Sequence, residues 1–173
     1  MNREGHLGAS ILYFLPFALL LVFLDRIELV AIGYVVIFFT FMLPDYDMKL
    51  PFLSHRKISH SIFASVFIGI IFLLLAVGVY YSNPLFITEI YTRHPLELIL
   101  FMGVMGFLTM IFHILGDIYT PTGVPLLAPF DYQSYTFDLF RFDNIIANYL
   151  FLLAGVLSLV GITGLVIYTK VSF

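Results

Sequence analysis

The segment "LELILFMGVMGFLTMIFHILGDIYTPTG", residues 96–123, decides the fold class of this chain. Its apolar part is long enough to cross a membrane, because about 20 apolar residues span the hydrocarbon core as a helix. The run ends with His113 and Asp117, which lie one helical turn apart and therefore on the same side of the helix. Ionisable side chains inside membrane helices are usually functional, so the pair is a candidate for metal binding. A structural pair that stabilises the helix end explains it equally well.

The composition of the whole chain agrees with a membrane protein. Of its 173 residues, 61% are hydrophobic and 11% are charged, whereas soluble domains carry about 25% charged residues. The sequence has no cysteine, which excludes disulfides and thiolate metal sites. The net charge of -3 and the lack of a basic block argue against nucleic acid as a partner.

Further apolar runs predict an all-α, polytopic integral membrane helical bundle of about five transmembrane helices, in a single domain over residues 1–173. The predicted spans cover about 7–24, 27–43, 61–81, 96–119 and 146–168. We expect the first span to be retained, because no small-residue cleavage site follows it. The loop 121–145 mixes aromatic and charged residues, which suits the headgroup layer, as a lid or a substrate-guiding flap. A plain connecting loop is equally compatible with its length.

Because successive spans alternate in direction, the chain ends and loops sort onto two sides of the membrane. The first side carries almost all of the candidate metal ligands: His6, Asp45, Asp47, His55, His60, His113 and Asp117. His94 is the one histidine on the second side. The first side also carries five of the eight Lys and Arg residues, which favours a cytoplasmic location for it in a multi-pass protein of the inner (cytoplasmic) membrane.

Two loop motifs on the first side contain chemistry-bearing residues. In "LPDYDMK", residues 43–49, an extended backbone would point Asp45 and Asp47 the same way, and such carboxylates repel unless a cation or proton lies between them. A polar turn that closes a helix is the alternative. In "SHRKISHSIF", residues 54–63, Ser59 or Ser61 can cap the third span and place His60 near a helix N-terminus, which favours the neutral imidazole that a metal requires.

The remaining residues of the second motif suit an anion. Arg56 offers a bidentate fork for a phosphate or carboxylate, although an interfacial basic loop that contacts lipid headgroups would also explain it. Imidazole and carboxylate ligands without thiolates suit zinc, manganese or iron(II). Seven candidate ligands are enough for one or two ions, and two-metal sites are typical of phosphoester hydrolysis. We therefore favour a metal site over a purely structural polar cluster.

The ordered set "H…PDYD…HRKISHS…HILGDIYTPTG" resembles the membrane-bound metal-dependent hydrolase family of bacteria and archaea. The matching positions are His6, Asp45, Asp47, His55, Arg56, His60, Ser61, His113, Asp117, Thr120 and Gly123. The sequence departs from that pattern at Ser59, where the family usually has threonine. More distantly, the motif order is similar to the zinc-dependent phospholipase C and single-strand nuclease superfamily.

This second resemblance implies that Asp45, His60, His113 and Asp117 bind one metal, with His6 near a second metal and Asp117 as a possible bridge. No histidine follows His113, so the three-metal cluster of that superfamily is not fully matched. Together the patterns predict a membrane-embedded hydrolase that uses metal-activated water on a phosphoester in a lipid or lipid-linked substrate.

The predicted roles follow from that reaction. Asp47, His55 and Arg56 are the candidate catalytic residues, and Arg56, Thr120 and Thr122 are the candidate substrate-binding residues. Membrane lipids are the expected partners. An ion, proton or metal transporter is a rival, although the polar residues cluster at one side and no inverted repeat is present. A non-catalytic scaffold whose metal only joins loops to helices is the other rival, because structural and catalytic ligands have the same residue types.

Overall fold

A computed structural model of the protein describes residues 1–49, 57–91 and 93–171, with the side chains of residues 48 and 49 left out. In these ranges the chain is helical apart from its loops and one isolated β-bridge between Val124 and Tyr135. Five helical segments are long and apolar enough to cross a membrane: α1 (Arg3–Phe23), α2 (Ile27–Thr40) together with the helical turns that continue it to Asp47, α3 (Ile62–Ser82), α5 (Pro95–Ile118) and α6 (Ile145–Val171). The predicted all-α, five-span fold is confirmed.

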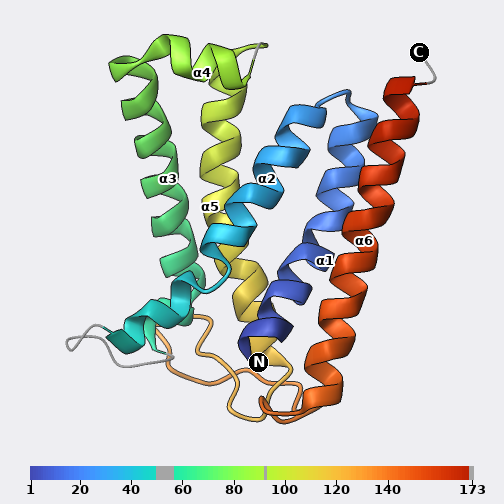
Figure 1. Cartoon of the computed structure of the whole chain (residues 1–173). Coiled ribbons are helices and arrows are strands. Elements are labelled where there is room, and N and C mark those ends of the chain that lie inside the picture. Colours follow the sequence, from blue (N-terminus) through green and yellow to red (C-terminus); the bar gives the residue numbers. More distant parts are fainter. Residues whose placement is uncertain (50–56, 92, 172–173) are drawn as a thin grey trace.

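The five long helices pack as two pairs with α2 between them (Figure 1). Helix α3 packs along α5 and helix α1 packs along α6, while α2 contacts both α1 and α5. Helix α5 is the most buried of the five, and α3 and α6 leave most of their apolar side chains exposed, as lipid-facing helices do. The two chain termini lie at opposite ends of the bundle, which is the consequence of an odd number of spans.

Glycines set the closest helix contacts. A Cβ atom at Gly8 of α1 would lie 2.3 Å from the Cα of Leu152 in α6, so the two backbones touch there. In the other pair, a Cβ at Gly106 of α5 would lie 2.7 Å from the Phe72 ring of α3. Small residues allow this approach in membrane bundles, where dispersion contacts rather than water exclusion drive helix association.

Shorter helices at the bundle ends differ from the sequence prediction. Asp45 and Asp47 lie in the 3₁₀ helix η1 (Leu43–Lys49), and the prediction of an extended segment is wrong. Because a 3₁₀ helix has three residues per turn, residues two positions apart point in different directions, and the two carboxylates therefore diverge. At the opposite end, α4 (Pro84–Ile90) lies within the predicted loop 82–95, capped by the Asn83 side chain with proline at its first turn.

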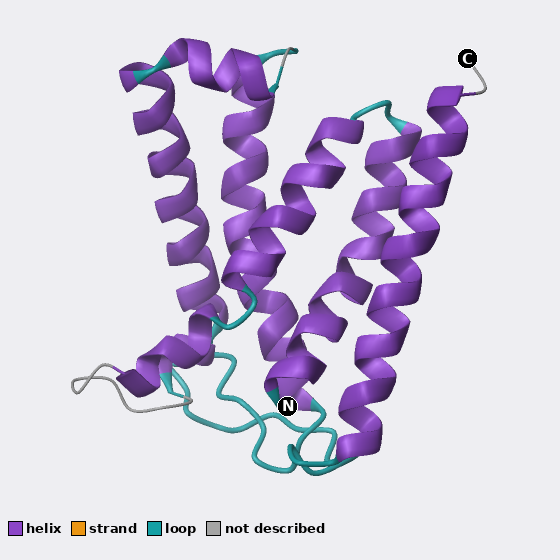
Figure 2. Ribbon diagram, viewed as in Figure 1, coloured by secondary structure: helices purple, strands orange, loops and turns teal. Residues whose placement is uncertain are grey.

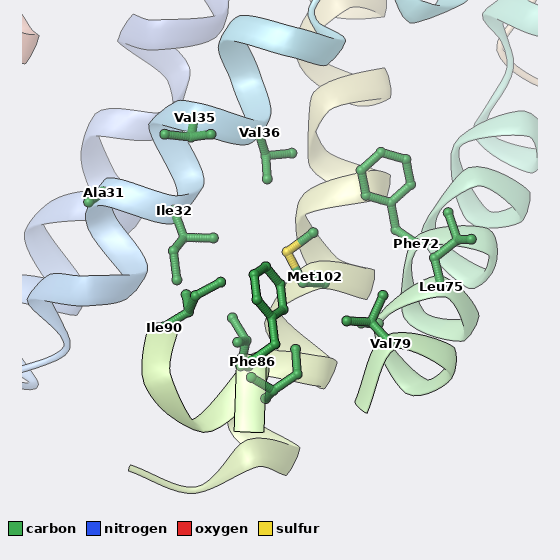
Figure 3. A pocket seen from close by; sticks show the side chains of 13 residues that line it. Ala31, Ile32, Val35, Val36, Phe72, Leu75, Val79, Phe86, Ile90 and Met102 are labelled. Atoms are coloured by element: carbon green, nitrogen blue, oxygen red, sulfur yellow. The ribbon is translucent and has the colours of Figure 1, made fainter. Parts of the chain in front are cut away.

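A wholly apolar pocket lies near α4, away from the polar end of the bundle (Figure 3). Its volume is about 490 Å³, and 13 residues of α2, α3, α4 and α5 line it, among them Ile32, Phe72, Phe86 and Met102. All of these residues are apolar, so the pocket offers no group for chemistry. Polar side chains gather at the other end, where Figure 2 shows most of the non-helical chain.

Candidate metal centre

Four elements bring imidazoles and carboxylates together at the end of the bundle that holds the N-terminus. Helix α1 contributes one residue, η1 two, η2 (Ile58–His60) one and the last turns of α5 two: His6, Asp45, Asp47, His60, His113 and Asp117. All are buried except Asp45, whose side chain is 20% exposed. His6 lies in the first turn of α1, because the helix begins at Arg3, so its expected position ahead of the first span is wrong.

Local hydrogen bonds fix the position of His60. The Ser61 hydroxyl accepts a hydrogen bond from the Ala64 amide at 3.1 Å and caps α3. The amide of Ile62 donates to the Leu126 carbonyl at 3.0 Å, which joins the start of α3 to the loop that follows α5. Of the two predicted N-caps, Ser61 is therefore the one that caps α3, and His60 immediately precedes this cap.

Four side chains form a group whose donor atoms suit a single metal ion. One donor atom from each of Asp45, His60, His113 and Asp117 lies within 4.8 Å of the other three. Asp45 Oδ1 lies 3.3 Å from both His60 Nε2 and His113 Nε2, and Asp117 Oδ2 lies 3.5 Å and 3.7 Å from the same nitrogens. A tetrahedral site with 2.0–2.1 Å bonds has ligand atoms about 3.3 Å apart. The group could hold a metal ion with little rearrangement.

The tautomer of His113 agrees with metal binding. Its Nδ1 lies 2.8 Å from the Phe41 carbonyl, which can only accept a hydrogen bond, so the proton is on Nδ1. When the ring carries only this proton, its Nε2 lone pair faces the carboxylates of Asp45 and Asp117, and Nε2 finds no hydrogen-bond partner among the described residues. Metal-binding histidines commonly donate their other ring N–H to a carbonyl in this way.

His60 is oriented by a similar pair of contacts. Its Nδ1 lies 3.0 Å from the Ser59 hydroxyl and 3.7 Å from Asp47 Oδ2, and Ser59 also donates a short hydrogen bond to Asp47. Nε2 is thereby directed at Asp45 and Asp117. Burial lowers the pKa of His60 below its ordinary value of 6.5, against the opposing effect of the nearby carboxylates. The low pKa favours the neutral ring that a metal requires.

His6 lies behind the four-residue group. Its ring stacks on His113 with centroids 3.8 Å apart, and its Nε2 lies 3.3 Å from Asp117 Oδ1, the oxygen that faces away from the group. The amino group of Met1 contacts the same oxygen at 2.6 Å. A Cβ atom at Gly116 would lie 2.9 Å from His6 Nδ1, so glycine is needed for His6 to reach this place. Among the described residues, Asp117 is the carboxylate that contacts His6, so these two residues are the ones that could share a second ion.

The other predicted site residues are placed less favourably. Thr120 is buried and its hydroxyl donates to the Asp117 carbonyl at 2.8 Å, which closes the end of α5. Thr122 is exposed. His55 and Arg56 lie outside the described residues, so their roles remain predictions, as do the substrate contacts of the two threonines. The sequence reading missed the contact of Ser59 with Asp47, although its place beside His60 was a usable signal.

Comparison with known proteins places the chain in a family. The family model described as YdjM inner membrane protein matches residues 1–171, and the chain therefore belongs to this family. The predicted multi-pass location in the inner membrane is confirmed by this match and by the five apolar helices. No curated protein and no solved structure gives a match.

Proposed function

We propose that the protein is a membrane-embedded, metal-dependent hydrolase that cleaves a phosphoester in a lipid or lipid-linked substrate. Asp45, His60, His113 and Asp117 hold the metal, and zinc is the first candidate because two imidazoles and two carboxylates suit it. The resemblance of the ordered motifs to membrane-bound metal-dependent hydrolases supports the same reaction class. A site at the end of the membrane spans also lies at the depth of the lipid headgroups, where a lipid substrate carries its phosphoester.

The observation that carries the proposal is the direction of the His113 lone pair. His113 Nε2 faces Asp45 Oδ1 at 3.3 Å while its Nδ1 proton is committed to the Phe41 carbonyl. Lone pairs and carboxylate oxygens repel each other at this distance, and a cation between them turns the repulsion into coordination. The same arrangement holds for His60 Nε2, which lies 3.3 Å from the same oxygen.

A catalytic role is favoured over a purely structural metal by the one exposed ligand. Catalytic metal sites keep a coordination position open to substrate or water, whereas structural sites are closed. Asp45 lines a pocket of about 530 Å³ and is the ligand that is 20% exposed. Substrate can therefore approach the group from the Asp45 side without unfolding any helix.

The division of labour follows from these contacts. A divalent cation held by the four residues would supply Lewis acidity toward a phosphoryl oxygen and would acidify a water molecule. Asp47 and Ser59 orient His60, so in this proposal Asp47 is a positioning residue rather than a free general base. The predicted roles of His55 in proton transfer and of Arg56 in steadying the phosphate charge belong to the same proposal.

Purified protein in detergent micelles or vesicles provides the test. Phospholipids and the soluble diester bis(p-nitrophenyl) phosphate would be incubated with zinc, manganese or iron(II), and again after chelation, and the released phosphomonoester or nitrophenol would be measured. We expect turnover that requires the metal and that the His113→Ala variant loses. The His94→Ala variant, altered at the opposite end of the bundle, serves as the matched control.

The outcome also separates the proposal from its rivals. Metal bound at one ion per chain with no turnover of any phosphoester would contradict hydrolysis and favour the structural scaffold. Uptake of the metal into sealed vesicles that contain the protein, without hydrolysis, would favour the transporter.

A further inference from the structure

A second polar feature borders the candidate metal centre at the junction of α1, α2 and η1. Here a pocket of about 530 Å³ is lined by Arg3, Phe38, Phe39, Phe41, Met42, Asp45 and Tyr46, and we refer to it as the Arg3–Asp45 pocket. Asp45 is shared with the metal centre, whereas Arg3 contributes no contact to it. The pocket therefore gives the centre an entrance whose chemistry can be read from its walls.

Arg3 gives the entrance a positive charge that is not paired with any acid among the described residues. The side chain is exposed, and it forms no ion pair with a described residue. Its guanidinium carbon lies 6.0 Å from the centre of the Phe41 ring, within the range of a cation–π contact that leaves its N–H groups available. The guanidinium fork matches the oxygens of a phosphate.

Phe41 connects Arg3 to the metal centre through its ring and its backbone carbonyl. The Phe41 ring contacts Arg3, and its carbonyl lies 2.8 Å from His113 Nδ1. Asp45 alone would repel a phosphate in the pocket. A divalent cation bound to Asp45 reverses this effect, so that cation and guanidinium would attract the same anion from two sides.

The other residues that line the pocket change from apolar to polar with membrane depth, as a lipid does from its acyl chains to its headgroup. Phe38 and Phe39 lie in the last turn of α2, on the membrane side of Asp45, and are 46% and 83% exposed. Tyr46 lies beyond Asp45 in η1 and is 49% exposed. Apolar rings thus stand at the depth of the acyl chains, and the charged and hydroxyl groups stand at the depth of the headgroups.

We propose that the Arg3–Asp45 pocket binds a membrane lipid with an anionic phosphate headgroup, and that Arg3 selects such lipids over zwitterionic ones. Phe38 and Phe39 contact the first methylenes of the acyl chains. The proposal rests on the proposed function, since it takes Asp45 as a ligand that faces the substrate. It adds a substrate class and a specificity residue to that site.

The chain has no tryptophan, which allows a direct binding test. The Phe39→Trp variant has a single tryptophan at the pocket, and its fluorescence is quenched when a brominated lipid lies against it. We would reconstitute the variant in phosphatidylcholine vesicles and titrate in brominated phosphatidylglycerol or brominated phosphatidylcholine. We expect the anionic lipid to bind about fivefold more tightly, in line with the attraction of one arginine for an anionic lipid surface.

Two matched variants separate Arg3 from general effects of charge. Adding Arg3→Gln to Phe39→Trp should abolish the preference. Adding Arg141→Gln should leave it unchanged, because Arg141 is exposed at the same end of the bundle and is paired with Asp143 at 3.2 Å. The Tyr149→Trp variant reports the ordinary lipid shell, because Tyr149 is 57% exposed in the first turns of α6. If Phe39→Trp folds poorly, Phe38→Trp replaces it.

The binding readout does not depend on turnover. A preference at residue 39 that matches the one at residue 149, or that survives Arg3→Gln, would overturn the proposal even if the protein hydrolyses phosphoesters. A preference lost with Arg3→Gln, together with no turnover in the hydrolysis assay, would support the lipid site and contradict the proposed function. If both hold, Arg3→Gln should raise KM for phosphatidylglycerol more than it raises KM for phosphatidylcholine.

Discussion

Acidic side chains at the two ends of the bundle have different partners. At the α4 end, Glu97 accepts hydrogen bonds from Arg26 at 2.5 Å and from the Tyr91 hydroxyl at 2.6 Å, and Asp25 is paired with Arg93 at 2.5 Å. At the end with the metal centre, Asp45 and Asp117 face imidazole nitrogens. Asp25 and Glu97 thus have guanidinium partners, whereas Asp45 and Asp117 face imidazole nitrogens that could bind a metal.

This contrast separates an end whose acids are paired with arginines from the end that holds the candidate metal centre. The ion pairs of the α4 end are partly exposed and complete in themselves, so they join α2, α5 and their connecting loops without any added ion. At the other end, Asp117 is buried and Asp45 is partly buried beside imidazole rings, and buried charge is costly unless it is paired or binds a metal. The Met1 amino group contacts Asp117, and a divalent cation would supply further positive charge.

The largest effect should follow from removal of a ligand. We expect His113→Ala to weaken zinc binding by more than about 100-fold, since loss of an outer partner of a ligand already costs about 10–100-fold. Metal content after purification and calorimetric titration with zinc would measure this. Zinc should also stabilise the unmodified protein, by about 2.7 kcal/mol at a free zinc concentration of 100 Kd, and should thereby raise its unfolding temperature.

The matched change at the α4 end is His94→Ala, which should leave both zinc content and zinc stabilisation unaltered. His94 precedes α5 at the end opposite His113. Equal loss of zinc in the two variants would mean that the metal binds without regard to the centre, and the contrast between the ends would fail.

Acid should affect the centre before it affects the α4 end. Burial holds the pKa of His60 below 6.5, so the folded state binds this proton at a lower pH than the unfolded state does. Without metal, stability is therefore full above about pH 6.5 and declines as the pH falls below it, by at most about 1.4 kcal/mol per pH unit for this group. Zinc affinity should fall over the same range, because protonated histidine cannot bind.

The α4 end provides the internal comparison for this titration. The hydrogen bond from Arg93 lowers the pKa of Asp25 below its ordinary value of 3.8, so this pair stays charged throughout the range in which His60 titrates. Calorimetry with zinc and thermal unfolding across about pH 5 to 8 would test the order. Zinc affinity that rises as the pH falls would contradict the assignment of neutral histidines as ligands.

A smaller effect is expected at Ser59, which contacts the centre only through other residues. Its hydroxyl bonds Asp47 and faces His60 Nδ1 at 3.0 Å. Ser59→Ala should weaken zinc binding about tenfold, the lower end of the range for outer partners of metal ligands. Ser59→Thr keeps the hydroxyl and should bind zinc as the unmodified protein does. Equal weakening in both variants would assign Ser59 a packing role instead.

Sequence reasoning could predict the fold and the shared side because both depend on span counting. Apolar length alone predicts five crossings, and alternation of direction then brings residues as distant as His6 and His113 to one end, where their rings stack at 3.8 Å. The local conformation of Asp45 and Asp47 was not predictable in the same way. The 3₁₀ helix η1 that holds them packs against η2 and α5, segments distant in the sequence whose contacts no local pattern encodes.

The role of Arg3 was hidden for a related reason. In the sequence it is one basic residue ahead of a span, and it counts only toward membrane orientation. Its approach to Phe41 and Asp45 depends on the position of α1 beside the end of α2. Hydropathy predicts that two helices lie in the membrane, whereas the contact between α1 and α2 includes Gly33, where a Cβ atom would lie 2.3 Å from the Phe14 ring, and a sequence pattern cannot pair these two residues.

The smallest effect tests whether the two ends are independent. Glu97 lies in the first turn of α5, and His113 and Asp117 lie in its last turns, so one rigid helix connects the ends. Glu97→Gln removes the charge that pairs with Arg26 but keeps an acceptor for Tyr91. Because Arg26 and Glu97 are 29% and 34% exposed, we expect a loss of at most about 1 kcal/mol of stability.

Zinc affinity of Glu97→Gln should stay within about twofold of the unmodified protein, because bonds at the start of α5 do not set the side-chain directions at its end. Thermal unfolding in detergent and zinc calorimetry would be measured on the same sample. A stability loss with unchanged zinc affinity would keep the ends separate. A loss of zinc affinity comparable to that of Ser59→Ala would mean that α5 shifts as a unit, since a displacement of its first turn would then move His113 and Asp117 away from Asp45 and His60.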